Sequence, residues 1–211
     1  NGIGMMPRNT INDLVRLPAP RRVGTVSLEA ALDGRRSVRE FRLEPMALAS
    51  LSQLLWACQG PIGDGRRRAA PSAGGTYPLS IVVAAGNVAD LPAGLYRYDS
   101  DGHALYRIVE GDFRRELYGA TVGQMAAASA PVSLMVSAVY DRTTARYGTR
   151  GMAYALIEAG HAGQNLYLQA TALGLGTTAI GAFREDVVRM VLHLDPQEHP
   201  VYLFPVGTPA G

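Results

Sequence analysis

The segment of residues 35–41, "RRSVREF", places three guanidinium groups and a hydroxyl within five residues. It directly follows the end of a predicted helix. Guanidinium forks, a hydroxyl and free backbone N–H groups are the donors that a phosphate monoester dianion requires. Closely spaced arginines can also form a solvated face. The formal net charge is only +2, and aromatic side chains are not interleaved with the basic ones, so no nucleic-acid partner is expected. A small phosphate ligand is the better interpretation, with Arg35, Arg36, Ser37 and Arg39 as candidate ligands.

Two glycine-containing segments suggest what else that ligand contains. In "PSAGGTYP", residues 71–78, Gly74 and Gly75 allow a planar molecule to approach the backbone closely. In "TTAIGAF", residues 177–183, Gly181 and Ala182 stand at a strand end, where a backbone N–H can point at a ligand. Each segment alone could be an ordinary connection. Together with the arginines they favour a flat, phosphorylated cofactor.

The composition excludes several kinds of chemistry. All 20 basic residues are arginine, so a pyridoxal Schiff base, a P-loop lysine and a lysine nucleophile are impossible. Cys58 is the single cysteine, so one subunit cannot form an internal disulfide or a thiolate metal site. No window has the roughly 18 uninterrupted apolar residues of a membrane span. We therefore expect a cytoplasmic protein without a membrane partner.

Three further patterns receive structural interpretations. "GLGTTA", residues 174–179, matches a dinucleotide fingerprint, but it runs from a helix end into a strand, which reverses the required order. Glu158 and His161 form a single E-x-x-H, whereas a di-iron bundle needs two such helices, so no metal site is expected. Residues 66–68, three consecutive arginines, are interpreted as a solvated loop.

The order of predicted elements favours an α+β domain. Residues 1–26 are proline-rich and are predicted to form an extended N-terminal arm on the surface or on a partner subunit, and residues 27–211 a single domain. Small residues in "AGHAG", at 159–163, predict close packing of the longest helix against another helix. The helices are expected at residues 27–34, 47–60, 151–173 and 184–194, the strands at 79–85, 94–99, 103–109, 130–140, 176–183 and 199–207, and a long loop at 60–78.

The chain resembles the nitroreductase-like superfamily of FMN-dependent oxidoreductases, in the SagB-type branch of thiazole/oxazole azoline dehydrogenases. The resemblance is carried, in family order, by "RRSVREF", "PSAGGTYPLSIVV", "GLYRYD", "ARYGTRGMAYALIEAGHAGQNLYLQATALGLG" and "AIGAF". It implies a three-layer sandwich with a central mixed or antiparallel sheet flanked by helices. It also implies an intertwined homodimer with FMN at the subunit interface and NAD(P)H as electron donor.

The same resemblance implies roles for individual residues. One subunit would bind the ribityl phosphate and the flavin edge through the arginine segment, and the other would line the isoalloxazine face. Gln124 would reach the polar edge of the ring, and a backbone N–H near Gly181 would point at N5. The implied cofactor-binding residues are Arg35, Arg36, Ser37, Arg39, Pro71, Ser72, Ala73, Gly74, Gly75, Gln124, Ile180, Gly181 and Ala182.

One departure leaves the reaction open. Azoline dehydrogenases carry a Lys-Tyr pair just before the long helix, where this chain has Arg146 and Tyr147. Arginine, with a pKa above about 12, does not act as a base at neutral pH, but Tyr147 still could. The first hypothesis is hydride transfer from NAD(P)H through flavin N5 to a small acceptor such as a nitroaromatic or quinone. The alternatives are oxidation of azoline rings in a modified peptide, and a non-redox module that binds or cleaves flavin.

Overall fold

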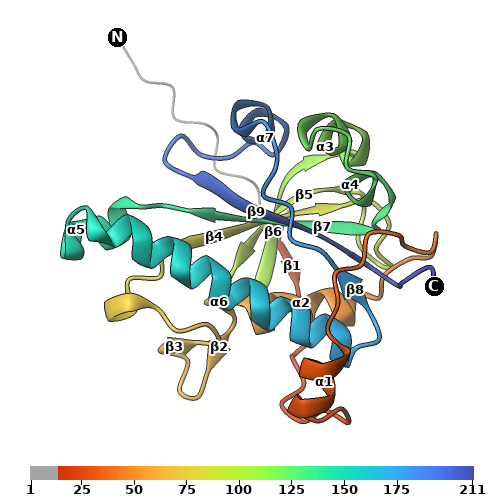
Figure 1. Ribbon diagram of the computed structural model, residues 1–211, viewed down its shortest axis with the longest axis horizontal. Coiled ribbons are helices and arrows are strands. Elements are labelled where there is room, and N and C mark those ends of the chain that lie inside the picture. The colour runs from red at the N-terminus through yellow and green to blue at the C-terminus, as the bar shows by residue number, and fades with distance from the viewer. Residues whose placement is uncertain (1–13) are drawn as a thin grey trace.

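The computed structural model describes residues 14–211, which form a central sheet with helices on both faces (Figure 1). The sheet strands are β1 (Leu14–Arg16), β4 (Leu79–Ala85), β5 (Gly94–Asp99), β6 (Ala104–Glu110), β7 (Val132–Ala138), β8 (Gly176–Thr177) and β9 (His199–Gly207). The helices are α1 (Leu28–Gly34), α2 (Leu48–Gln59), α3 (Arg114–Ala120), α4 (Met125–Ser129), α5 (Asp141–Tyr147), α6 (Arg150–Ala172) and α7 (Glu185–Val191). The strand order is β1-β6-β5-β4-β7-β9-β8, and all neighbours are antiparallel. The predicted α+β sandwich is confirmed, with the antiparallel form of the sheet.

The central strands bury side chains on both faces of the sheet. In β4, Ile81 and Val83 face the core under α2 and α6, whereas Val82 and Ala84 face the opposite core. Successive side chains of a strand point to opposite faces, so a strand covered on both sides reads as a continuous apolar run. For this reason residues 79–85 and 130–140 were predicted correctly as buried strands.

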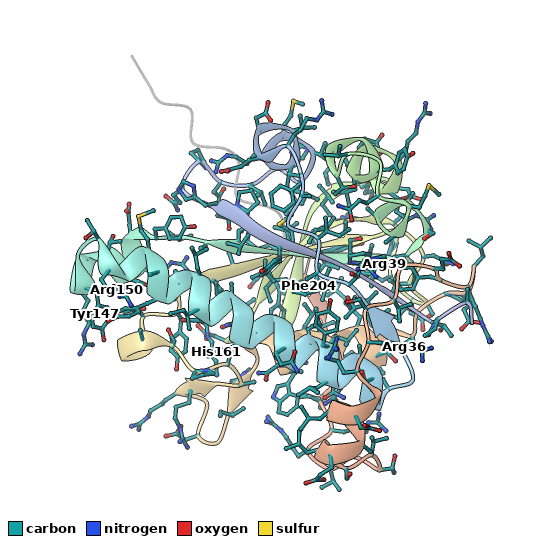
Figure 2. The ribbon with its side chains drawn as sticks, in the orientation of Figure 1. Arg36, Arg39, Tyr147, Arg150, His161 and Phe204 are labelled. Atoms are coloured by element: carbon teal, nitrogen blue, oxygen red, sulfur yellow. The ribbon has the colours of Figure 1, made fainter. Side chains whose placement is uncertain are left out.

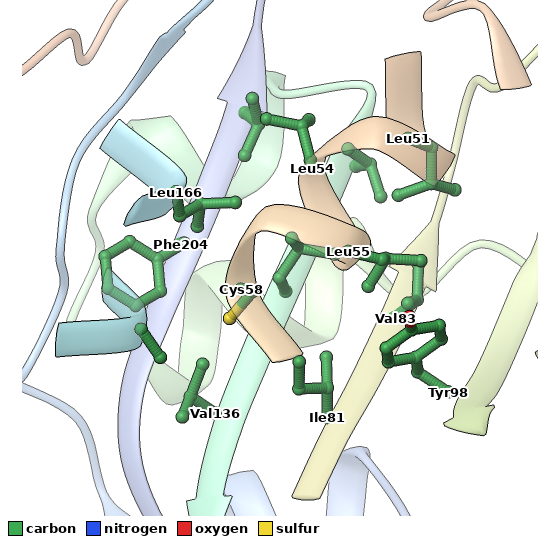
Figure 3. Packing of buried hydrophobic residues seen from close by; sticks show 14 of the residues in the cluster. Leu51, Leu54, Leu55, Cys58, Ile81, Val83, Tyr98, Val136, Leu166 and Phe204 are labelled. Carbon is green, nitrogen blue, oxygen red and sulfur yellow. The ribbon is translucent and has the colours of Figure 1, made fainter. Parts of the chain in front are cut away.

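Helix α2 packs beside α6 on one face of the sheet and contributes to the core there (Figure 3). Its residues Leu51, Leu54, Leu55 and Cys58 are fully buried. Burial raises the pKa of the Cys58 thiol to about 12, so it stays protonated at physiological pH. Cys58 therefore acts as a small core residue.

The small residues of helix α6 pack mainly against elements of the same subunit. Ala159, Ala162 and Gly163 are buried, and a Cβ at Gly163 would lie 2.7 Å from Cζ of Phe204 in β9. Helix α2 packs against the side of α6 that carries Ala159 and Ala162, whereas a second central helix from a partner subunit, which the resemblance implies, stays a prediction. Gly160 differs, because it is exposed and its missing Cβ would meet open space.

The opposite layer consists of α3, α4 and α7. Residues 184–194 were predicted as a helix, but α3 and α4 were not, because helices this short show little apolar periodicity. The predicted strand 176–183 is regular only in β8, and Ile180 then makes a single bridge to Leu203. The predicted loop 60–78 contains a small hairpin of β2 (Pro61–Ile62) and β3 (Arg67–Arg68) and the turn η2 (Ala73–Gly75).

The N-terminal arm is described only from residue 14 onward, and residues 1–13 lie outside the described part. Strand β1 pairs with β6 at the edge of the sheet. The Ser52 hydroxyl donates to the carbonyl of Pro18, and the amide of Gln53 bonds both backbone groups of Arg21. These contacts join the described part of the arm to α2 of its own subunit.

Candidate functional site

The arginine segment lies between β8 and the last residues of the chain. The N–H of Val38 donates to the carbonyl of Thr177 at 2.9 Å, and Ser37 forms a bridge with the same residue. On the other side, the N–H of Arg42 donates to Thr208 and the N–H of Ala210 donates to Glu40. Backbone bonds on both sides therefore hold residues 37–42 in an extended conformation, with Phe41 buried.

Tyr167 of α6 joins this segment to the strand end that follows β8. Its hydroxyl accepts a hydrogen bond from the N–H of Ala179 at 2.7 Å and lies 3.2 Å from Oγ of Ser37. The guanidinium of Arg35 stands over its ring, 5.4 Å from the centroid. Sequence reasoning missed Tyr167, because an aromatic residue in a long amphipathic helix is most often part of the core.

Arg36 and Arg39 project from the segment with their charge uncompensated (Figure 2). Both are exposed, and within residues 14–211 neither lies within ion-pair distance of a carboxylate. Arg36 also lines a hollow of about 180 Å³ with Gly34, Val38 and Pro209. Five N–H donors on each guanidinium are thus available to an anion.

The strand end near Gly181 offers free backbone donors. The N–H and carbonyl of Ile180 both pair with Leu203. In the described part of the chain, the next two N–H groups, of Gly181 and Ala182, make no backbone hydrogen bond, and both residues are exposed. Gln124, just before α4, donates its amide to the carbonyl of Ala182 at 3.3 Å. The structure therefore brings Gln124, Gly181 and Ala182 together.

The glycine-rich loop 71–75 forms a second group of candidate residues. Gly74 and Gly75 adopt φ values of +60° and +66°, which favour glycine. Arg146 donates to the carbonyl of Gly74 at 3.1 Å, and a Cβ at Gly74 would contact the Tyr147 hydroxyl and lie 3.0 Å from the Arg146 guanidinium. The two residues singled out before the long helix therefore lie directly against this loop.

A buried carboxylate supports the loop from behind. Glu158 of α6 is only 2% exposed, accepts a hydrogen bond from the amide of Gln59, and interacts with the hydroxyl of Ser72. Burial raises the pKa of Glu158, and these interactions and the charge of Arg68 offset part of the rise. His161 is exposed, and the residues described contain no group of three metal-binding side chains. Glu158 thus lies in α6 at the back of the loop.

The two groups lie at opposite ends of α6. Figure 2 shows Tyr147 and Arg150 at one end of this helix and Arg36 and Arg39 beyond the other. The helix has 23 residues. At about 1.5 Å per residue it is roughly 34 Å long. One subunit therefore does not bring the arginine segment and the glycine loop to the same small ligand.

A second hollow is separate from both groups of candidate residues. It has a volume of about 380 Å³ and lies between the arm at residues 21–28, α2 and the second half of α6. Its wall includes Trp56 and Gln169 but none of the predicted cofactor ligands. In the part of the chain that is described, no helix combines the length and apolar character needed to cross a membrane.

Comparison with known proteins agrees with this architecture. The family model described as "Nitroreductase family" matches residues 32–208. The "Putative nitroreductase MJ1384" of Methanocaldococcus jannaschii is 42% identical over 182 residues, covering 86% of this chain and 91% of that protein. A crystal structure of a "putative nitroreductase" from Ralstonia eutropha JMP134 has a TM-score of 0.81 and 30% identity, covering 99% of this chain and 96% of that one.

A more distant structure belongs to a peptide-modifying assembly. The Escherichia coli microcin synthetase complex McbBCD, with truncated pro-MccB17 bound, contains a chain that matches with a TM-score of 0.72 and 20% identity. The match covers 92% of this chain and 77% of that one, and at this identity it shows the fold alone. The family match over most of the chain, together with the two closer relatives, shows that this protein is an oxidoreductase of the nitroreductase family.

Proposed function

We propose that the protein is an FMN-dependent oxidoreductase that takes electrons from NAD(P)H and passes them to a small organic acceptor such as a nitroaromatic or a quinone. The observation that carries the proposal is found within residues 14–211: Arg36 and Arg39 have no acidic partner there, and the N–H groups of Gly181 and Ala182 make no backbone hydrogen bond there. A phosphate needs the first kind of donor, and the polar edge of a flavin needs the second.

The residues fit FMN as follows. Arg35, Arg36, Ser37 and Arg39 would hold the phosphate, and Gln124 would face the polar edge of the ring. The N–H groups near Gly181 would stabilise negative charge at the edge of the ring during electron transfer. Bound FMN would supply hydride chemistry, in which two electrons and one proton are accepted from the donor and then released to the acceptor.

The second group of residues would come from a partner copy. Loop 71–75 is too far along α6 to share a ligand with Arg36 of the same chain, whereas in a dimer it could lie on the partner's flavin. The exposure of apolar side chains on α6 supports such a partner, because Met152, Leu156 and Ile157 are about half exposed, beside Gly160. Apolar side chains and a glycine on one helix face favour close packing of a second helix.

The experiment combines a visible spectrum with a measurement of mass in solution. We expect one oxidised flavin per subunit, a dimer, and bleaching when NADH or NADPH is mixed anaerobically. Ile157→Asp should give a folded monomer that binds FMN weakly, whereas Met190→Asp, at an exposed position on α7, should stay a flavin-bound dimer. A colourless protein that FMN does not stabilise would contradict the proposal. Flavin that neither nicotinamide reduces would favour a non-redox flavin module.

A second candidate function is oxidation of azoline rings in a peptide. It is favoured by the position of Tyr147, whose hydroxyl adjoins Gly74, and by the likeness in fold to a chain of a microcin synthetase complex. Tyr147 Oη would then take up or release the proton, because Arg146 stays charged. Anaerobic bleaching by an azoline-containing peptide, without bleaching by NADH or NADPH, would support this function over the first.

A further inference from the structure

Three arginines lie near the start of α6, and two of them, Arg142 and Arg146, contact the segment of residues 74–77. Arg142 donates to the carbonyl of Tyr77 at 3.2 Å, and Arg146 donates to the carbonyl of Gly74 at 3.1 Å. Arg150 stands over the ring of Tyr154, 5.5 Å from its centroid. All three are exposed, and they follow one another at intervals of four residues across α5 and α6.

No carboxylate balances these three charges within residues 14–211. Six other arginines of the described chain pair with an acid, among them Arg66 with Asp64 and Arg68 with Asp101. None of Arg142, Arg146 and Arg150 lies within ion-pair distance of Asp or Glu, although Asp141 adjoins the first of them in sequence. The charges therefore accumulate beside a loop that would face the flavin.

The structural contacts of these arginines leave most of their donors unused. A guanidinium has five N–H groups, and within residues 14–211 Arg142 and Arg146 each donate one side-chain hydrogen bond, through a single nitrogen. Arg150 begins α6, whose first turn contains no acidic residue, and a cation at this end of a helix is disfavoured by the backbone dipole. The corresponding dipole of α5 favours Arg146, which lies in the last turn of that helix, so helix electrostatics accounts for Arg146 but gives no reason for Arg150.

We propose that Arg142, Arg146 and Arg150 form a subsite for the anionic group, a phosphate or a carboxylate, of the small molecule that exchanges electrons with the flavin. The proposal rests on the proposed function, because it is the flavin that places this molecule beside Gly74. Arginine suits the task, since its planar fork binds both kinds of anion through paired hydrogen bonds. The subsite selects substrates by charge, and the reaction itself needs nothing further from Arg142 or Arg150.

The test compares charged and neutral substrates in each half-reaction. Flavin reduction is followed by stopped flow with NADPH, with NADH and with 1-benzyl-1,4-dihydronicotinamide, which has no phosphate. Reoxidation is followed with 4-nitrobenzoate and with 4-nitrobenzamide, its neutral analogue. The protein is compared with the double variant Arg142→Gln/Arg150→Gln and with Arg115→Gln, which removes an exposed arginine from α3.

We expect the second-order rate constant of the half-reaction to fall in the double variant by at least about tenfold for the anionic substrate and by less than about twofold for its neutral counterpart, as for a lost charge-assisted hydrogen bond. A slower reaction with the nicotinamide nucleotides would mean that the subsite binds the phosphate of the electron donor. A slower reaction with 4-nitrobenzoate would mean that it binds the carboxylate of the electron acceptor. Arg115→Gln should not change the ratio of the rate constants for the anionic and the neutral substrate in either half-reaction. The variant Arg142→Lys/Arg150→Lys should recover part of the preference, because the charge is retained.

The outcomes separate this inference from the proposed function. Suppose that the double variant binds flavin and reacts normally with the neutral substrates, and that the rate constant for no anionic substrate falls relative to that for its neutral analogue. The proposed subsite is then wrong, while the proposed function stands. A protein that binds no flavin overturns both.

Discussion

The hydroxyl of Tyr167 accepts a hydrogen bond of 2.7 Å from the backbone N–H of Ala179. The same oxygen lies 3.2 Å from Oγ of Ser37, so one side chain of α6 links the arginine segment to the strand end at Gly181. The two segments that we assign to the phosphate and to the ring edge of the cofactor are therefore fixed relative to each other by a residue that sequence reasoning did not select.

Replacing Tyr167 by Phe should weaken both stability and cofactor binding. The N–H of Ala179 loses its partner, at a cost of about 0.5–1.5 kcal/mol in the free energy of unfolding. Urea unfolding and FMN titration measure the two effects. Tyr106→Phe is the matched control, because its half-exposed hydroxyl has no hydrogen bond to the described chain. Equal FMN affinity for Tyr167→Phe and the unmodified protein would show that Tyr167 has no role at the site.

Replacing Arg36 or Arg39 by Ala should lower FMN affinity, each by roughly 1.5–3 kcal/mol for a lost charge-assisted hydrogen bond. The free energy of unfolding of the protein without FMN should hardly change, because both side chains are exposed and have no acidic partner among the described residues. Quenching of FMN fluorescence measures the affinity, and Arg115→Ala serves as control. Full flavin occupancy in the double variant would mean that the phosphate binds elsewhere.

Gly163→Ala should destabilise the fold. The added Cβ would lie 2.7 Å from the ring of Phe204, which is itself almost fully buried. Forcing a methyl group into such a core costs typically about 1–3 kcal/mol, despite the better helix propensity of alanine. Thermal unfolding measures the effect. Gly119→Ala on α3, with open space around its missing Cβ, should not lower the melting temperature. Equal melting temperatures for the Gly163 variant and the unmodified protein would contradict the packing described for α6.

The ionisation of Glu198 should account for part of the change in the free energy of unfolding at acidic pH. Its burial alone would raise the pKa of the carboxyl, but hydrogen bonds and charge attraction from Arg97 outweigh burial and leave the pKa below its usual value. The folded state therefore binds this proton more weakly than the unfolded state does. The resulting stabilisation is complete above the ordinary pKa of about 4.3 and is lost as the pH falls through the lower pKa of the folded protein.

Unfolding by urea between pH 3 and pH 7 checks this expectation. Glu198→Gln should lose about 1.5–3 kcal/mol at pH 7, and its deficit should shrink in acid. Asp64→Asn, which breaks an exposed pair with Arg66, should change stability by less than about 1 kcal/mol. A deficit for Glu198→Gln that is independent of pH would contradict the lowered pKa.

The sequence by itself determined the layers of the fold and the candidate ligands. Continuous apolar runs such as residues 79–85 identified strands buried on both faces, and apolar spacing identified α2 and α6. The resemblance carried by "RRSVREF" and "PSAGGTYP" pointed to FMN chemistry, and the family is shown by the match over residues 32–208. These signals are local, because they depend on the residue types and spacing within one segment.

Only the tertiary structure decided how those segments meet. Tyr167 reaches both Ser37 and Ala179, and Arg146 reaches Gly74 across 72 positions of sequence. The structure also showed that α6 separates the arginine segment from the glycine loop, and that Gly163 is small because Phe204 lies against it. No pattern within a segment contains these facts, since a side chain's partners depend on which distant elements the fold packs against it.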